Sequence, residues 1–252
     1  MTTTQPVHVR DIPFERLHNV RDLGGWRGAD GRAVAFGLLY RGDSLGKLVP
    51  GSEDERTFLG LGVRTVVDLR YPWEIEPAGR VPAYPGLAYH NLSIEHRPYD
   101  QPALGADVDP GPFLAERYRE VAEDGVAEIR QVLELVADPG SGPLLFHCAS
   151  GKDRTGLVAA LVLTLLGVPE ADVVAEFALT ERAREALIGQ WSEGHGGQVP
   201  GWPGYGRTPA GVITRLYAGL RADYGSVEGY VAQRLGLDAQ FTAALRERLL
   251  VE

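Results

Sequence analysis

The sequence predicts an α/β fold with a central, mostly parallel sheet flanked by helices. Residues 63–69 are mostly apolar and β-branched, as expected for a strand buried on both faces. Residues 113–137 repeat apolar side chains at helical spacing. Residues 144–166 combine a short apolar strand, a polar loop and a long apolar helix. Strands that alternate with helices in this way favour an α/β arrangement.

The N-terminal segment predicts turns and a first strand. Residues 19–25 are rich in turn-forming side chains, and the Asp30-Gly31 pair indicates a hairpin turn. A strand is then expected over residues 37–40, which are apolar or aromatic after a single glycine.

The next segment predicts a capped helix, a strand and a long loop. The helix is expected over residues 52–61, with Ser52 as its N-cap and Glu55 as the partner in a capping box. Residues 87–92 predict another strand. Residues 95–112 contain four prolines and two glycines, so an irregular loop should follow that strand.

The central segment predicts two helices followed by the strand–loop–helix unit. Residues 113–137 should form the two helices, with a break at Gly125. After the strand at 144–146, residues 155–166 are apolar nearly all round, and a helix of that kind must be buried. Gly167 fits the end of this helix.

The C-terminal segment predicts one unusual loop and two more helices. Residues 189–211 contain eight glycines and three prolines, and a structureless stretch of that length is usually a functional lid or disordered. Residues 226–250 predict two amphipathic helices separated by Gly236. Because no linker-like break or internal repeat divides the chain, residues 1–252 are expected to form a single domain.

Composition and charge exclude several classes of protein. The net charge of -9 at pH 7 argues against a nucleic-acid-binding protein, which would carry a basic face. No run of eighteen apolar residues occurs, so no membrane span is expected. Residues 1–10 lack the pattern of a signal peptide, which favours a cytoplasmic protein; export without a signal peptide stays open.

The single cysteine, Cys148, excludes an internal disulfide and a Cys-rich zinc site. We therefore predict no metal and no cofactor, and the sequence makes no prediction of oligomeric state. Metal-ligand spacing is also missing among five of the histidines, namely His8, His18, His90, His96 and His195.

The position of Cys148 between a strand and a helix suits a nucleophile. A free cysteine has a pKa of about 8.5, whereas attack on a phosphate ester requires the thiolate. The N–H groups and the positive dipole end of a following helix stabilise an anion, and the same N–H groups bind phosphate oxygens. We therefore expect an ionised sulfur at the base of a phosphate-binding loop.

The residues after Cys148 suit this role. Arg154 starts the helix and can present its planar guanidinium to a phosphate bidentately. His147 could fix the loop by hydrogen-bonding backbone groups, and the Thr155 hydroxyl could donate to the sulfur. The phosphate cradle would comprise Ala149, Ser150, Gly151, Lys152, Asp153, Arg154 and Thr155.

The string at residues 147–156, His-Cys-Ala-Ser-Gly-Lys-Asp-Arg-Thr-Gly, resembles the signature of the protein tyrosine phosphatase superfamily. Its Gly-Lys-Asp-Arg-Thr-Gly ending resembles the bacterial tyrosine- and lipid-type phosphatases, which act on phosphoproteins and phosphoinositides. Further landmarks of that subfamily occur in the same order, so the resemblance covers most of the chain. They are residues 19–25, 39–41, 67–70 and 224–226.

The resemblance implies a tyrosine-phosphatase-like fold and a role for each loop residue. Cys148 would attack phosphorus and form a phosphocysteine, while Arg154 and the loop amides hold the phosphoryl group. Asp153 would be the general acid, and Lys152 would bind a second phosphate or an inositol headgroup. The substrates would be phosphotyrosine proteins first, with phosphoserine, phosphothreonine and phosphoinositides as further possibilities.

Two departures from the family pattern are visible. Many relatives take the acid from a Trp-Pro-Asp loop, and the nearest string here is Tyr-Pro-Trp-Glu at residues 71–74. Some relatives cover the site with a two-helix lid, against which the Gly- and Pro-rich residues 189–211 argue.

The identity of the general acid stays open. In the first turn of a helix Asp153 would also serve simply to complement the dipole, and neighbouring Lys152 and Arg154 oppose its protonated form. Asp68 ends a predicted strand at the edge where α/β proteins place their sites, and is a second candidate. The alternative for Asp68 is a structural ion pair.

Structural alternatives stand beside the other assignments. Arg41 and Arg70 follow strands, where each would support the pocket or pair with Asp43, Asp68 or Glu74. Lys152 is one of only two lysines and is either a solvated side chain or a phosphate contact. Cys148 itself could be an inert buried thiol.

Two other functions compete with a phosphatase. A phosphate-recognising binding module would keep the loop without turnover, and a thiol sulfurtransferase also places a cysteine loop before a helix. A nucleotide-binding Walker loop is excluded, because Phe146 and Asp153 stand where it requires Gly and Ser or Thr.

Overall fold

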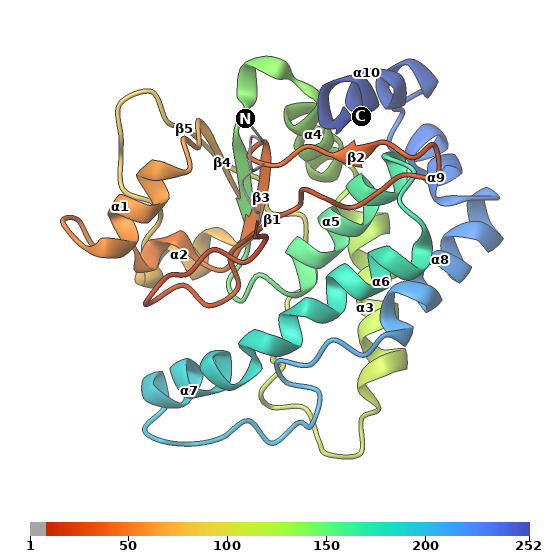
Figure 1. Ribbon diagram of the computed structural model, residues 1–252. Helices are drawn as coiled ribbons and strands as arrows, with labels where there is room; N and C mark the ends of the chain where they lie inside the picture. The colour runs from red at the N-terminus through yellow and green to blue at the C-terminus, as the bar shows by residue number, and fades with distance from the viewer. Residues whose placement is uncertain (1–8) are drawn as a thin grey trace.

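The computed structural model describes residues 9–252, and a five-stranded sheet lies at its centre (Figure 1). The strand order is β1-β3-β6-β4-β5. β1 pairs antiparallel with β3, and the other pairs are parallel, so the predicted α/β class is confirmed. The strands are β1 Arg21–Asp22, β3 Leu39–Gly42, β4 Thr65–Asp68, β5 Ala88–Asn91 and β6 Leu144–His147.

The central strands divide their side chains between two cores. In β6, Leu144 and Phe146 enter the larger core, whereas Leu145 enters the smaller one. Helix α1 contributes to the smaller core, and α3 to α6 with α8 to α10 cover the larger one on the opposite face of the sheet (Figure 1). The α-helices are α1 Glu53–Gly60, α2 Pro72–Ala78, α3 Pro110–Asp124, α4 Val126–Ala137, α5 Asp153–Leu165, α6 Glu170–Ala178, α7 Arg184–Gly194, α8 Gly211–Tyr224, α9 Val227–Gln233 and α10 Ala239–Leu249.

A small antiparallel sheet joins the N-terminal region to the C-terminal end of the described chain. β2 (Ala33–Val34) pairs with β7 (Leu250–Val251). The predicted turn around Asp30-Gly31 lies between residues 27 and 33, which pair antiparallel across it. The C-terminal strand thereby fixes α10 beside the N-terminal region (Figure 1).

Glycines explain two of the element boundaries. β3 starts at Leu39, two residues later than predicted, and Gly37 before it has φ +78, outside the range of a strand. The predicted break at Gly125 is confirmed, since α3 ends before it and α4 starts after it. A Cβ at Gly125 would lie 2.1 Å from the carbonyl oxygen of Ile94, so the segment after β5 can approach the junction of α3 and α4 this closely only because residue 125 is a glycine.

The predicted capping box of α1 forms only in part. The Ser52 side chain accepts a hydrogen bond from the Glu55 amide at 3.2 Å, as expected of an N-cap. The Glu55 carboxylate accepts from the Gly51 amide at 2.6 Å instead of from Ser52. The other predicted strands and helices occur, with shifts of one or two residues at most of their ends.

The prediction for residues 189–211 is wrong over its first part. α7 continues to Gly194, and only residues 195–210 form an irregular connection to α8. Tertiary packing overrides the local glycine content here, because Leu187 is buried and the Trp191 ring lies 5.9 Å from the Tyr205 ring between centroids. Figure 1 shows α7 projecting below the sheet, at the edge where the loop after β6 lies.

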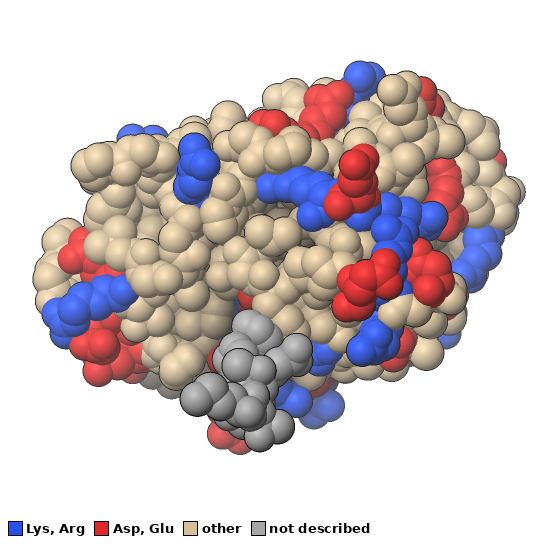
Figure 2. All heavy atoms as spheres, turned by 45° about the horizontal axis from the view of Figure 1, so that its top comes forward, with Lys and Arg blue, Asp and Glu red and all other residues tan. Residues whose placement is uncertain are grey.

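Acidic and basic side chains are intermixed on the face shown in Figure 2. Among residues 9–252 no helix has both the length and the hydropathy that a bilayer span requires. Residues 1–8, which carry most of the signal-peptide interpretation and include His8, lie outside the described part of the chain.

Candidate active site

The loop after β6 lies at the carboxyl edge of the parallel sheet. His147 ends β6, and its register partners are Gly42 at the end of β3 and Asp68 at the end of β4. Cys148 follows, only 1% exposed, and α5 begins at Asp153. Three parallel strands therefore deliver their last residues to the same place, which is where α/β folds position their sites.

Every backbone carbonyl of residues 147–152 is held by a donor. Because a trans peptide directs its carbonyl and its amide to opposite sides, these bonds favour amides that face the inside of the loop. The pairs are Leu69 N to His147 O at 2.8 Å, His147 Nδ1 to Cys148 O at 3.0 Å, Ser44 N to Ala149 O at 3.0 Å, Asn19 Nδ2 to Ser150 O at 2.9 Å, Arg41 Nη2 to Gly151 O at 2.6 Å and Gly156 N to Lys152 O at 2.8 Å.

Gly151 is required by the curvature of this loop. Its φ is +68, and a Cβ there would lie 2.5 Å from the carbonyl oxygen of Gly42. Any other residue would both strain the backbone and push the loop away from the end of β3. The close approach of these two segments is what gives the loop its curl beside Cys148.

The Arg154 guanidinium is oriented by one carboxylate from helix α2 and one from the segment after β5. Its Nη1 and Nη2 donate to the two oxygens of Glu74 at 2.5 and 2.9 Å, and its Nε lies 3.6 Å from Glu95. Burial opposes the charge of Arg154, but the Glu74 bonds and the charges of Cys148 and Glu95 outweigh it, so its pKa is raised. Arg154 is therefore a fixed cation next to Cys148.

Asp153 and Lys152 differ in their exposure to solvent. The Asp153 side chain is 23% exposed, and it accepts a hydrogen bond from the Tyr118 hydroxyl at 3.0 Å. The Lys152 side chain is 1% exposed, and its Nζ lies 3.5 Å from Asp153. Burial, supported by the Asp153 charge, raises the pKa of Tyr118 well above its ordinary value, so the phenol stays a donor.

Asp68 is enclosed in a network of donors. Its carboxylate accepts three hydrogen bonds from Arg70: from the backbone amide, from Nε at 2.9 Å and from Nη2 at 2.6 Å. It also accepts one from the Tyr89 hydroxyl at 3.1 Å. Burial raises the pKa of Asp68, but His147 and Arg70 lower it by more, and the net direction is downward. These contacts favour the structural ion pair with Arg70 over a proton donor.

Two sequence-based assignments have different partners in the structure. Arg41 pairs with Glu176 and with the loop carbonyl of Gly151, not with Asp43, Asp68 or Glu74. The Thr155 hydroxyl is buried and has no hydrogen-bond partner among residues 9–252, so the expected bond to the Cys148 sulfur is absent.

A cavity of about 200 Å³ lies between the loop and α7. Gln190, whose side chain accepts from Lys47 at 2.6 Å, ties α7 to the body of the protein, because Lys47 also donates to Asp43 at 2.6 Å. The cavity is lined by Gln101, Ala149, Ser150, Lys152, Leu187, Gln190, Trp191, Tyr205 and Gly206.

A model described as the tyrosine phosphatase family matches residues 12–251. The chain belongs to this family. The phosphatase is 35% identical to a tyrosine-protein phosphatase of Nostoc commune, over 86% of this chain and 76% of that protein. It is 32% identical to a Cupriavidus necator protein named as a candidate tyrosine-protein phosphatase, over 90% of this chain and 85% of that one. A triple specificity phosphatase, PtpB of Mycobacterium tuberculosis, is 29% identical over 69% of this chain and 74% of its own length.

Among solved structures, the SIW14 phosphatase core from S. cerevisiae covers 57% of this chain and 72% of its own, with 18% identity and a TM-score of 0.32. That overlap is too small to support any conclusion. Family membership confirms the predicted class of enzyme, a cysteine-dependent phosphatase, and Cys148 is its single cysteine.

Sequence reasoning missed several residues that shape the site of this phosphatase. Glu74, Glu95, Tyr118 and Glu176 all contact loop residues or their supports, yet none was assigned to the site. The rule that singled out Asp68, which ends β4, does not reach Glu95, which lies four residues beyond the end of β5. The sequence around Tyr118 and around Glu176 contains no pattern that indicates a functional site.

Replacing Glu95 with glutamine is expected to reduce the pH dependence of the phosphatase's stability. Burial raises the pKa of Glu95 to about 7 from an ordinary 4.5, against the lowering effect of Arg154. Its stabilising contribution is complete below pH 4.5 and is lost as the pH rises through 7. Ionised Glu95 should therefore cost up to about 3 kcal/mol at pH 8.

Urea unfolding of both proteins at pH 5 and pH 8 measures this effect. From pH 5 to pH 8, the unfolding free energy of Glu95→Gln should rise relative to that of wild type. A difference in unfolding free energy that is the same at both pH values would contradict the assignment.

Proposed function

We propose that this phosphatase hydrolyses phosphomonoesters through a phosphocysteine on Cys148, with phosphotyrosine in proteins as its principal substrate. The observation that carries the proposal is that the six backbone carbonyls of residues 147–152, around the buried Cys148, each accept a hydrogen bond. A loop held in that way presents a ring of amides to a phosphoryl group, and Arg154 adds a cation beside it.

The reaction has two displacements. In the first, the Cys148 sulfur forms a bond to phosphorus as the bond to the ester oxygen breaks, and that oxygen takes a proton from Asp153. In the second, water attacks phosphorus, its proton returns to Asp153, and the S–P bond breaks to release inorganic phosphate and the thiolate. The loop amides and Arg154 hold the phosphoryl oxygens throughout.

The cavity beside the loop supports a preference for an aromatic ester. Leu187, Trp191 and Tyr205 give it an apolar side that a phenyl ring would cover. On its polar side Lys152 is almost fully buried, and its Nζ has no hydrogen-bond partner among residues 9–252. That ammonium supports a second activity on substrates with an additional phosphate, such as phosphoinositides.

A substrate panel tests the proposal. Wild type and Lys152→Ala are assayed in EDTA with p-nitrophenyl phosphate, with phosphotyrosine and phosphothreonine peptides, and with phosphoinositides. We expect turnover of the aryl ester and the phosphotyrosine peptide, and a selective loss on phosphoinositides for Lys152→Ala. Phosphate binding without turnover would favour the binding module, and sulfur transfer from thiosulfate to cyanide would favour the sulfurtransferase.

The general acid is identified by leaving groups of different pKa. Asp153→Asn should lose about 10²-fold or more in kcat on a poor leaving group such as phenol, and little on a good one such as p-nitrophenol. Asp68→Asn should lose activity equally on both, because its carboxylate pairs with Arg70 rather than with substrate. If Asp68→Asn instead shows the leaving-group dependence, the two roles are exchanged.

A further inference from the structure

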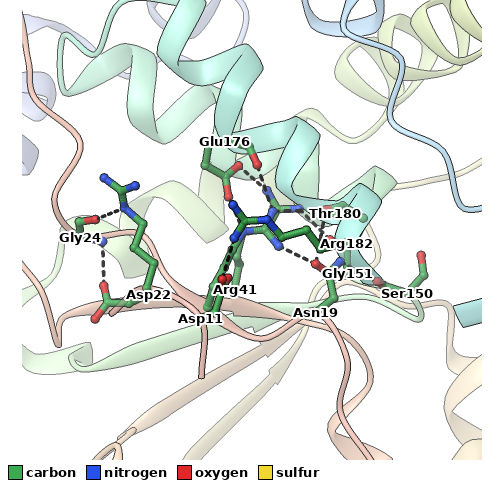
Figure 3. A network of polar contacts seen from close by, with 12 residues as sticks. Asp11, Asn19, Asp22, Gly24, Arg41, Ser150, Gly151, Glu176, Thr180 and Arg182 are labelled. Carbon is green, nitrogen blue, oxygen red and sulfur yellow. Dashed lines mark hydrogen bonds and ion pairs between the residues drawn. The ribbon is translucent and has the colours of Figure 1, made fainter. Parts of the chain in front are cut away.

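A buried polar cluster, which we call the loop anchor, lies beneath the phosphate loop (Figure 3). All of its members are at most 4% exposed, and it contains two guanidinium groups against one carboxylate. Burying such charges is unfavourable unless they are paired and hydrogen-bonded, so their arrangement needs a physical reason. The loop anchor consists of Asn19, Arg21, Arg41, Glu176 and Thr180.

Glu176 of α6 divides its carboxylate between the two arginines. Its Oε1 accepts from Arg21 Nε at 2.7 Å, and its Oε2 accepts from Arg41 Nη1 at 2.6 Å. Arg21 also donates to Asn19 Oδ1 at 2.5 Å and to Thr180 Oγ1 at 3.2 Å. One carboxylate of α6 therefore connects β1 and β3.

The opposite ends of this cluster hold the loop. Arg41 Nη2 donates to the Gly151 carbonyl at 2.6 Å, and Asn19 Nδ2 donates to the Ser150 carbonyl at 2.9 Å. These are two consecutive carbonyls of the turn that faces the phosphate site. Figure 3 shows Glu176, Arg41, Gly151 and Asn19 converging from separate segments of the chain.

The loop anchor also places charge near the sulfur. Burial lowers the pKa of Arg41 to about 10, against the Glu176 and Cys148 charges, so Arg41 stays a cation at neutral pH. With Arg21 and Glu176 the cluster carries one surplus positive charge, and Arg41 interacts electrostatically with Cys148. A thiolate would compensate that charge.

We propose that Arg41 and Asn19, oriented by Glu176, are positioning residues: by holding the Ser150 and Gly151 carbonyls they direct the amides of the same peptide groups, those of Gly151 and Lys152, toward the phosphoryl group. This inference rests on the proposed function, because it concerns the same loop. It differs from a purely structural role in that it predicts weaker anion binding and slower turnover in a protein that is still folded.

Arg41→Lys separates geometry from charge. Lysine keeps the cation but cannot bridge Glu176 and the Gly151 carbonyl as the planar fork does. We expect kcat for p-nitrophenyl phosphate to fall about 100-fold and tungstate to bind about tenfold more weakly. Alkylation of Cys148 by iodoacetamide at pH 6.5 should stay within about threefold of wild type, since the charge remains.

Two further variants complete the test. Asn19→Ala removes the hydrogen bond to the Ser150 carbonyl without changing charge. We expect smaller losses of kcat and of tungstate affinity than for Arg41→Lys. If Arg41→Lys does not fold, Asn19→Ala provides the test alone. Arg182→Lys is the matched control, because Arg182 pairs with Asp11 at 2.7 Å close by but is 66% exposed and does not touch the loop. Its kcat and tungstate affinity should match wild type.

Different results would overturn the proposed function and the positioning role of Arg41 and Asn19. Wild type that binds tungstate without hydrolysing any ester would end the proposed function, while the tungstate affinities of the variants would still report on the anchor. A folded Arg41→Lys or Asn19→Ala protein with wild-type kcat and wild-type tungstate affinity would overturn the positioning role.

Discussion

Replacing Cys148 with serine is expected to reduce turnover of phosphate esters by about 10⁴-fold or more while tungstate still binds the loop. Serine has nearly the shape of cysteine, so the carbonyl bonds around the loop should persist. The serine hydroxyl stays protonated beside Arg154, and the adjacent imidazole, His147, directs Nδ1 to the backbone rather than to the side chain at position 148.

Single-turnover assays on p-nitrophenyl phosphate measure the loss of activity in Cys148→Ser. Tungstate titration of the same sample measures its anion affinity. Retained tungstate affinity shows that the variant is folded and that the loop is intact. Turnover close to wild type in the serine protein would remove Cys148 from the role of nucleophile and, with it, the phosphocysteine route.

The loop could be predicted from sequence because its chemistry is local. His147, Cys148 and Arg154 are within eight residues, between an apolar strand and an apolar helix. The break at Gly125 was predictable for a similar reason, since a glycine between two periodic segments is a local signal. These features depend on few contacts from elsewhere in the chain.

The surroundings of the loop could not be predicted, because ion-pair partners are chosen by the fold. Glu74 is 80 residues from Arg154, and Glu176 is 135 residues from Arg41. With 23% of residues charged, the sequence offers many carboxylates for each arginine. The fold decides between them: the sheet order brings β3 and β4 to either side of β6, and α2 and α6 carry Glu74 and Glu176 to the arginines.

α7 was mispredicted for the opposite reason. Its glycines are a correct local signal of weak helix propensity, but packing of Leu187 and the Lys47–Gln190 hydrogen bond outweigh it. The consequence is functional, because the segment expected to be without structure forms a wall of the cavity beside the loop.

Arg154→Lys should lower kcat by about 10² to 10³-fold although the charge is kept. In the native protein Glu74 takes one N–H from each terminal nitrogen of Arg154, which fixes the guanidinium plane and leaves the remaining N–H groups for phosphate oxygens. An ammonium group in the same place would pair with Glu74 as a point charge. It could not hold Glu74 and two phosphoryl oxygens in one plane.

Arg32→Lys provides the matched control, because Arg32 also donates twice to a carboxylate, at 3.0 and 2.8 Å from Asp30, but in a surface turn remote from the loop. Steady-state kinetics on p-nitrophenyl phosphate should leave Arg32→Lys at wild-type kcat and show the full loss in Arg154→Lys. If a folded Arg154→Lys protein keeps kcat within a few-fold of wild type, then net positive charge alone stabilises the transition state. The paired geometry of Arg154 and Glu74 would then serve folding rather than catalysis.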